Sequence, residues 1–115
     1  MGDRGNIKVG KIYLYTHWSG SDIKNILLKA LGRKQRWDDE PYLTRIIFCG
    51  LLEGDLDGET GFGISTGICD NENNIFEVDV EKQEVRELEW DWKKRKMEKV
   101  LNKWTFKQFI TKEPL

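Results

Sequence analysis

The sequence predicts a single α+β domain in which helices pack on one face of a mostly antiparallel sheet of about five strands. Segments with alternating apolar and polar residues lie near both ends of the chain, and segments with helical apolar spacing lie between them. The expected order is β-β-α-α-β-β-β, followed by a C-terminal helix. A parallel doubly wound fold would need strands and helices to alternate, and they do not. The 115 residues suffice for one domain, 1–115, and are too few for two of ordinary size.

Two short segments near the start of the chain predict a β-hairpin. Residues 7–9 and 12–16 both alternate between apolar and polar side chains, and Gly10-Lys11 between them is typical of a turn. The second strand is expected to end near His17, because the Ser-Gly-Ser-Asp segment 19–22 interrupts the alternation.

Two amphipathic helices are expected next. The first begins after Ser21 or Asp22, either of which can cap it, and Gly32 is suited to the left-handed position past its end. The second begins after Asp38 or Asp39. The apolar stripes are Ile23, Ile26, Leu27, Ala30 and Leu31 in the first helix, and Leu43, Ile46, Ile47, Gly50 and Leu51 in the second.

The second half of the chain predicts three more strands. Residues 62–68, 76–80 and 85–90 alternate and are joined by polar links, which indicates an antiparallel meander. Apolar residues within 92–104 have partly helical spacing and predict a helix. The alternative is that the strand at 85–90 continues and returns. Thr105 can cap a short final helix.

Composition favours a soluble, cytoplasmic protein. The net charge is −1, no stretch approaches the length of a membrane span, and the start of the chain lacks the apolar run of a secretory signal. Cys49 and Cys69 lie in apolar patterns and predict two buried free thiols in a reducing compartment. A disulfide would form only if the fold brings them close together.

The sequence offers little for catalysis. His17 is the single histidine, and its candidate partners in a hydrolase or phosphodiesterase are Asp38 and Asp39. A zinc site would need three or four histidine or cysteine ligands, and no phosphate-binding loop is present. We therefore expect no metal and no cofactor, and we favour a protein that is not an enzyme.

Polar and aromatic residues gather where the predicted elements meet. Aromatic rings stack on bases and arginines pair with phosphates, so these residues predict a binding site for a nucleotide-like anion. The competing interpretation is structural, with tryptophans covering the core, Asp39 as a helix cap and arginines paired with neighbouring aspartates. The candidate ligand-binding residues are Arg4, His17, Trp18, Arg36, Trp37, Asp38 and Arg45.

Two further surfaces are candidates for macromolecular partners. The basic run at 93–96 is the basis of an alternative hypothesis, nucleic-acid binding, which the overall charge makes less favoured. Trp90, Trp92 and Trp104 either complete the core or form a patch that assembles a homo-oligomer.

Three segments resemble a family of small uncharacterised proteins from bacteria and their phages. The segments are GDRGNI at 2–7, LYTHW at 14–18 and RWDDEPYLTRIIF at 36–48. The resemblance implies a phage or prophage source and supplies no activity. Together with the junction residues, it leads to the hypothesis of a non-catalytic module that binds a host protein or sequesters a nucleotide-like ligand.

Overall fold

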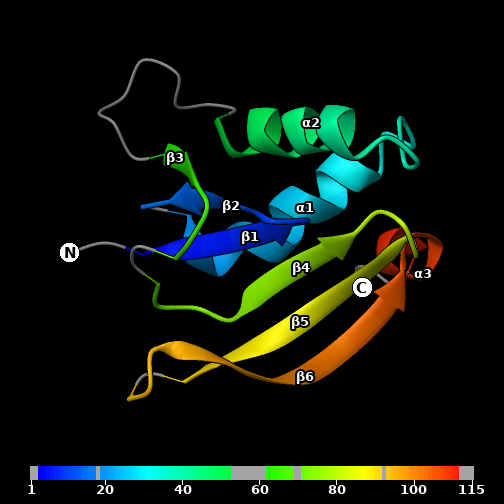
Figure 1. Cartoon of the computed structure of the whole chain (residues 1–115). Coiled ribbons are helices and arrows are strands. Elements are labelled where there is room, and N and C mark those ends of the chain that lie inside the picture. Colours follow the sequence, from blue (N-terminus) through cyan, green and yellow to red (C-terminus); the bar gives the residue numbers. More distant parts are fainter. Residues whose placement is uncertain (1–2, 18, 53–61, 69–70, 92, 112–115) are drawn as a thin grey trace.

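The structure is a computed structural model that describes residues 3–17, 19–52, 62–68, 71–91 and 93–111. It confirms the predicted fold class: a six-stranded, mostly antiparallel sheet with helices packed against it (Figure 1). The elements in chain order are β1 Gly5–Val9, β2 Ile12–Thr16, the 3-10 turn η1 Gly20–Asp22, α1 Ile23–Leu31, α2 Glu40–Leu52, β3 Phe62–Ser65, β4 Ile75–Asp79, β5 Glu84–Asp91, β6 Lys96–Thr105 and α3 Phe106–Thr111.

The strands lie in the order β3-β2-β1-β4-β5-β6, and every pair is antiparallel except β1 with β4. The expected meander of the three later strands is therefore wrong at its first step. β3 pairs with β2, whereas β4 lies beside β1, with Ile7 opposite Phe76. Alternation along a strand predicts which face is buried, but it does not identify the neighbouring strand.

The predicted helix over 92–104 is also wrong, and the alternative of a returning strand is correct. β6 pairs with β5 through two register shifts near Leu88. As a result, Leu88 and Trp90, two residues apart, lie opposite Val100 and Met97, which are three residues apart. A bulge of this kind breaks the period of two, so the apolar residues of β6 imitate helical spacing.

One face of the sheet forms the core with the helices. In Figure 1, α1 and α3 lie behind the sheet and α2 lies along its upper edge. Alternate residues of the strands point toward the helices, which bury an apolar stripe on each side of the interface. The largest fully buried side chains are Phe106, Phe109, Ile7, Leu14, Ile23, Leu27, Leu31, Leu43, Ile47, Ile75, Val9 and Val78.

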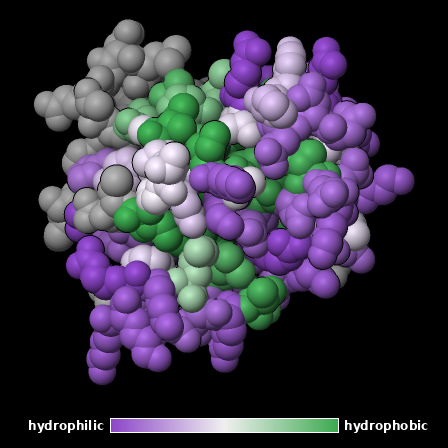
Figure 2. Space-filling view, in the orientation of Figure 1, coloured by the Kyte–Doolittle hydropathy of each residue, from purple (hydrophilic) through white to green (hydrophobic). Residues whose placement is uncertain are grey.

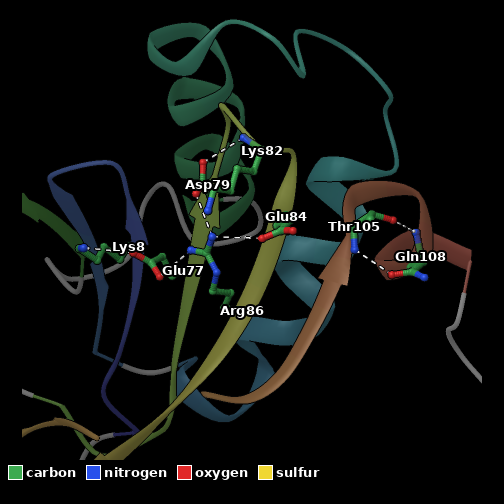
Figure 3. A network of polar contacts seen from close by, with 8 residues as sticks. All are labelled: Lys8, Glu77, Asp79, Lys82, Glu84, Arg86, Thr105 and Gln108. Atoms are coloured by element: carbon green, nitrogen blue, oxygen red, sulfur yellow. Dashed lines mark hydrogen bonds and ion pairs between the residues drawn. The ribbon is translucent and has the colours of Figure 1, made fainter. Parts of the chain in front are cut away.

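The ends of α2 and α3 confirm two predicted caps. Asp39 accepts a hydrogen bond from the Tyr42 N–H through its carboxylate, at 3.3 Å. At α3, the Thr105 hydroxyl accepts from the Gln108 N–H at 3.1 Å, and the Gln108 side chain accepts from the Thr105 N–H at 3.0 Å (Figure 3). This reciprocal pair is a capping box, which satisfies two backbone donors at once.

The ends of α1 differ from the prediction. Asp22 occupies the N-cap position, but its carboxylate accepts from the Asn25 side chain rather than from a backbone N–H. Gly32 has a φ of −63° and remains right-handed. The left-handed residue is Lys34, with a φ of +58°, because the chain makes one more turn before it leaves the helix.

Cys49 is exposed, so its predicted burial is wrong. The buried face of α2 is formed by Ile46, Ile47 and Leu51. Cys49 lies two residues from Ile47 and from Leu51, which places it on the opposite side of a helix with 3.6 residues per turn. Cys69 lies outside the described residues.

The other face of the sheet carries a network of ion pairs centred on Arg86 (Figure 3). The Arg86 guanidinium lies 2.9 Å from Asp79, 3.0 Å from Glu77 and 3.1 Å from Glu84. Lys8 extends the network to β1 through its 3.2 Å contact with Glu77. The hydrogen bond to Asp79 is the largest influence that raises the pKa of Arg86.

The network predicts a specific loss of stability in acid. Burial opposes ionisation of Asp79, but hydrogen bonds from Arg86 and from the Lys82 N–H outweigh it and lower its pKa below the usual 3.8. The unfolded chain therefore takes up the proton first as the pH falls. The stability that this carboxylate contributes is fully present above pH 3.8 and is lost as the pH falls below that value.

We expect the free energy of unfolding, measured by urea denaturation between pH 6 and pH 2.5, to decline less steeply in Asp79→Asn than in the unmodified protein. Asp38→Asn, which removes an exposed carboxylate from the loop between α1 and α2, is the matched control and should retain the unmodified slope. Superimposable curves for the unmodified protein and Asp79→Asn would contradict the assignment.

Candidate ligand-binding site

The loop between α1 and α2 is folded around the last carbonyl of α1. The Leu31 carbonyl accepts hydrogen bonds from the Lys34 N–H at 3.0 Å and from the Trp37 indole Nε1–H at 3.1 Å. Lys34 and Arg36 are both left-handed, with φ values of +58° and +59°. This conformation costs a residue with a side chain roughly 1–2 kcal/mol, and such local strain is characteristic of functional segments.

Trp37 joins this loop to the C-terminal helix. Its ring lies edge-to-face against Phe106, with centroids 5.3 Å apart and planes at 72°. Phe106 is 1% exposed, whereas Trp37 is half-buried. The indole is thus fixed from two directions, by the carbonyl of Leu31 and by the core, while part of its surface remains accessible.

A hollow of about 440 Å³ opens between the loop and α3. Its volume falls in the usual range for small-molecule sites. The hollow combines apolar surface from Trp37 and Ile110 with the cationic side chains of Lys34 and Lys107. Within the described part of the chain, neither lysine forms an ion pair. The lining residues are Lys34, Trp37, Lys107, Gln108, Ile110 and Thr111.

Two of the predicted arginines meet at the start of α2. The guanidinium carbons of Arg36 and Arg45 lie 4.6 Å and 5.2 Å from the centre of the Tyr42 ring, which is 39% exposed. The tyrosine ring attracts both cations and holds them close together. No ion pair of either arginine occurs among the described residues, so this cluster adds positive charge to the same loop.

Two of the other predicted residues, Arg4 and His17, lie away from this loop. Arg4 pairs with Glu72, with its backbone N–H at 2.8 Å and its guanidinium at 3.3 Å from the carboxylate. The His17 ring nitrogen Nδ1 lies 2.9 Å from the Tyr15 hydroxyl, and the His17 carbonyl accepts from the Asp3 N–H at 2.7 Å. Trp18 lies outside the described residues. Asp38 is exposed on the α1–α2 loop.

The structure does not bring the six described candidates together at one site. The start of α2 lies beside the β1–β2 turn, since a Cβ added to Gly10 would lie 2.7 Å from the Glu40 carboxylate. His17 follows the opposite end of β2, about five residues away, or roughly 17 Å along a strand. The histidine–aspartate pair of the hydrolase hypothesis, which required Asp38 or Asp39 near His17, is therefore not assembled.

A clasp of hydrogen bonds around Asp3, which the sequence did not predict, joins the start of the chain to η1 and to the segment before β4. Its members are Asp3, Arg4, Gly20, Ser21, Glu72 and Asn73. Asp3 accepts hydrogen bonds from the Ser21 N–H at 2.9 Å and from the Asn73 amide at 3.0 Å, and its backbone carbonyl accepts from the Gly20 N–H. The Ser21 hydroxyl contributes most to lowering the pKa of Asp3. The hydrogen bond from the Arg4 N–H is the largest influence that lowers the pKa of Glu72.

Trp104, one of the three tryptophans of the C-terminal third, packs against the core. Trp104 stacks on Phe76 with centroids 6.4 Å apart and lies edge-to-face with Phe109 at 5.2 Å. Lys24 from α1 covers the same ring at 5.0 Å. Trp90 is half-buried on β5, and Trp92 lies outside the described residues.

Further hollows lie elsewhere on the described part of the chain. A groove of about 290 Å³ runs between α1 and α2, and one of about 500 Å³ adjoins the β1–β2 turn. Neither contains a residue predicted from the sequence to bind a ligand. Over the described ranges, no group of three or more histidine, cysteine, aspartate or glutamate side chains is arranged to hold a metal ion. No helix within those ranges has the length and apolar character needed to cross a bilayer.

No family model, curated protein or solved structure matches this chain. The resemblance to small bacterial and phage proteins therefore stays a prediction from the three quoted segments.

Proposed function

We propose that this protein is a non-catalytic binding module for a small phosphate-bearing aromatic ligand, of which a mononucleotide is the simplest example. The observation that supports the proposal most directly is the hollow of about 440 Å³ between Trp37 and α3, with Lys34 and Lys107 in its lining. The aromatic ring of Trp37 is suited to the base of a nucleotide, and the two lysine ammonium groups are suited to its phosphate.

Each part of the ligand has a suitable partner. A base bound against the exposed part of Trp37 would gain stacking energy of about 1–3 kcal/mol. The indole N–H is already bonded to Leu31, so the ring need not reorient on binding. The lysine ammonium groups supply positive charge for the phosphate, and their lack of ion pairs within the described chain means that no carboxylate must first be displaced.

The wider biological setting belongs to the same proposal. The segments at 2–7, 14–18 and 36–48 support a phage or prophage source, and the composition favours a cytoplasmic site of action. The third segment includes Trp37 and the Arg36–Tyr42–Arg45 cluster, so it overlaps the proposed site. Sequestration of a nucleotide-like ligand of the host would require no catalytic group at this position.

The test compares four nucleoside monophosphates with their unphosphorylated nucleosides by isothermal titration calorimetry and by NMR of the indole N–H groups. We expect at least one monophosphate to bind, and to shift the Trp37 indole resonance. Lys34→Gln and Lys107→Gln should each weaken binding by about fivefold, which corresponds to about 1 kcal/mol for one charged hydrogen bond at a solvent-exposed site.

Lys99→Gln on β6 is the matched control, because it removes an exposed lysine far along the strand from α3. It should leave the affinity unchanged. Equal loss in all three variants would indicate attraction by net charge alone. Absence of binding by every monophosphate, with the protein folded, would refute the proposed function.

A further inference from the structure

β6 forms one outer edge of the sheet. The sheet order places β5 on its inner side, and no described strand pairs with its outer side. Nearly all of its ten residues are exposed. A ten-residue strand extends about 34 Å, and its outer side presents backbone N–H and C=O groups to another chain on either side of the irregularity that faces Leu88.

The edge is strongly basic. Residues 93–103, which span the β5–β6 hairpin tip and most of β6, include six lysines or arginines and one acidic residue, for a net charge of +5. The single carboxylate, Glu98, has only long contacts with Lys94 at 4.0 Å and Lys96 at 3.9 Å. Figure 2 shows the corresponding lower left part of the molecule as hydrophilic.

Between these charges lie two exposed apolar side chains. Val100 is 50% exposed and Leu101 is 40% exposed, and Lys99 and Lys103 flank them. An isolated row of lysines would serve only to keep an edge soluble. Here the apolar pair interrupts that row at the middle of the strand, where an added strand would bury it.

We infer that the outer edge of β6 binds an extended, acidic segment of a partner protein by strand addition. In this mode the backbone ladder supplies affinity and the alternate side chains supply specificity. The segment has acidic residues opposite Lys99 and Lys103 and apolar residues opposite Val100 and Leu101. This surface is separate from the hollow at Trp37, so the inference does not rest on the proposed nucleotide site.

The charge selects against two other occupants. A second copy of β6 would bring two edges of net charge +5 together, and like charges on paired strands are destabilising. A nucleic acid would satisfy the charge but could not continue the backbone ladder and would leave the apolar pair without a partner. An acidic polypeptide satisfies the charge, the ladder and the apolar pair together.

The test uses as its probe a ten-residue peptide with Glu-Thr-Val-Val-Glu at its centre, which in an antiparallel pairing places glutamates opposite Lys103 and Lys99 and valines opposite Leu101 and Val100. We expect binding by calorimetry, with NMR shifts and slowed amide exchange confined to β6 and the hairpin tip. The same peptide N-methylated at alternate residues on its pairing edge keeps its charge but loses its donors, and it should bind at least tenfold more weakly. A lysine–valine peptide should not bind.

The Lys99→Glu/Lys103→Glu variant should bind the acidic peptide at least about tenfold more weakly, because two attractions become repulsions. Lys11→Glu on the β1–β2 turn is the matched control and should bind normally. Equal affinity for the N-methylated peptide would overturn strand addition. So would tight binding of an oligonucleotide of the same charge with no response to the acidic peptide, or a dimer that forms through β6 in light scattering.

Discussion

Replacement of Phe106 by alanine is expected to lower the free energy of unfolding by about 3–5 kcal/mol. Phe106 is 1% exposed, and its removal would leave a cavity where α3 meets the rest of the core. It is also the ring against which Trp37 is held at 5.3 Å. The same substitution should therefore change the Trp37 indole resonance and weaken ligand binding at the hollow.

Urea denaturation provides the first measurement, and indole NMR of the folded fraction provides the second. Phe106→Leu retains most of the volume and should cost less than half as much. Ile64→Ala serves as an exposed apolar control, because Ile64 is 59% exposed, and its effect should stay within about 0.5 kcal/mol. Comparable losses for Phe106→Ala and Ile64→Ala would show that α3 is not part of the core.

The second large effect is expected at Gly20. A Cβ at this position would lie 2.4 Å from the Asn73 amide nitrogen and 2.6 Å from the Asp3 carbonyl oxygen. The second contact is with backbone, which cannot move aside without breaking the hydrogen bond from the Gly20 N–H. Gly20→Ala should lower the free energy of unfolding by about 3 kcal/mol, the upper part of the range for overpacked sites.

Gly63→Ala is the matched control, since no atom of the described residues lies within 4 Å of its added Cβ. It should leave the thermal midpoint within a few degrees of the unmodified protein, whereas Gly20→Ala should lower it by more than about 10 °C in a domain of this size. Equal midpoints for the two variants would mean that the clasp around Asp3 does not form in solution.

Local pattern was sufficient to predict most of the elements. The first hairpin, both central helices and the cap at Thr105 depend on residues within a few positions of one another. The signals that predict such elements lie within a few neighbouring residues: apolar periods of 2 for strands and 3.6 for helices, turn glycines and capping side chains. These predictions succeeded because tertiary contacts reinforced the local preference.

Long-range pairing could not be predicted in the same way. The parallel alignment of β1 with β4 and the clasp between Asp3 and Asn73 join residues about 70 positions apart. The bulged register of β6 depends on its partner β5, so its own apolar spacing was misleading. At the candidate site, Trp37 and the arginines could be predicted because their side chains are suited to binding a nucleotide. Lys107 and Ile110 could not be predicted, because they lie 70 or more positions from Trp37 and belong to another helix.

The sheet consists of two contiguous halves that meet along a single seam. Strands β1 to β3 come from residues 5–65 and β4 to β6 from residues 75–105, and among the described strands β1 beside β4 is the only pair that joins the two sets. Contacts across it, such as Lys8 with Glu77, close a loop of 69 residues. Closing such a loop costs about 4 kcal/mol of chain entropy, more than closing a tight hairpin. We expect the β1–β2 and β4–β5 hairpins to organise locally first, and the pairings of β1 with β4 and of β2 with β3, which both join distant parts of the chain, to form later.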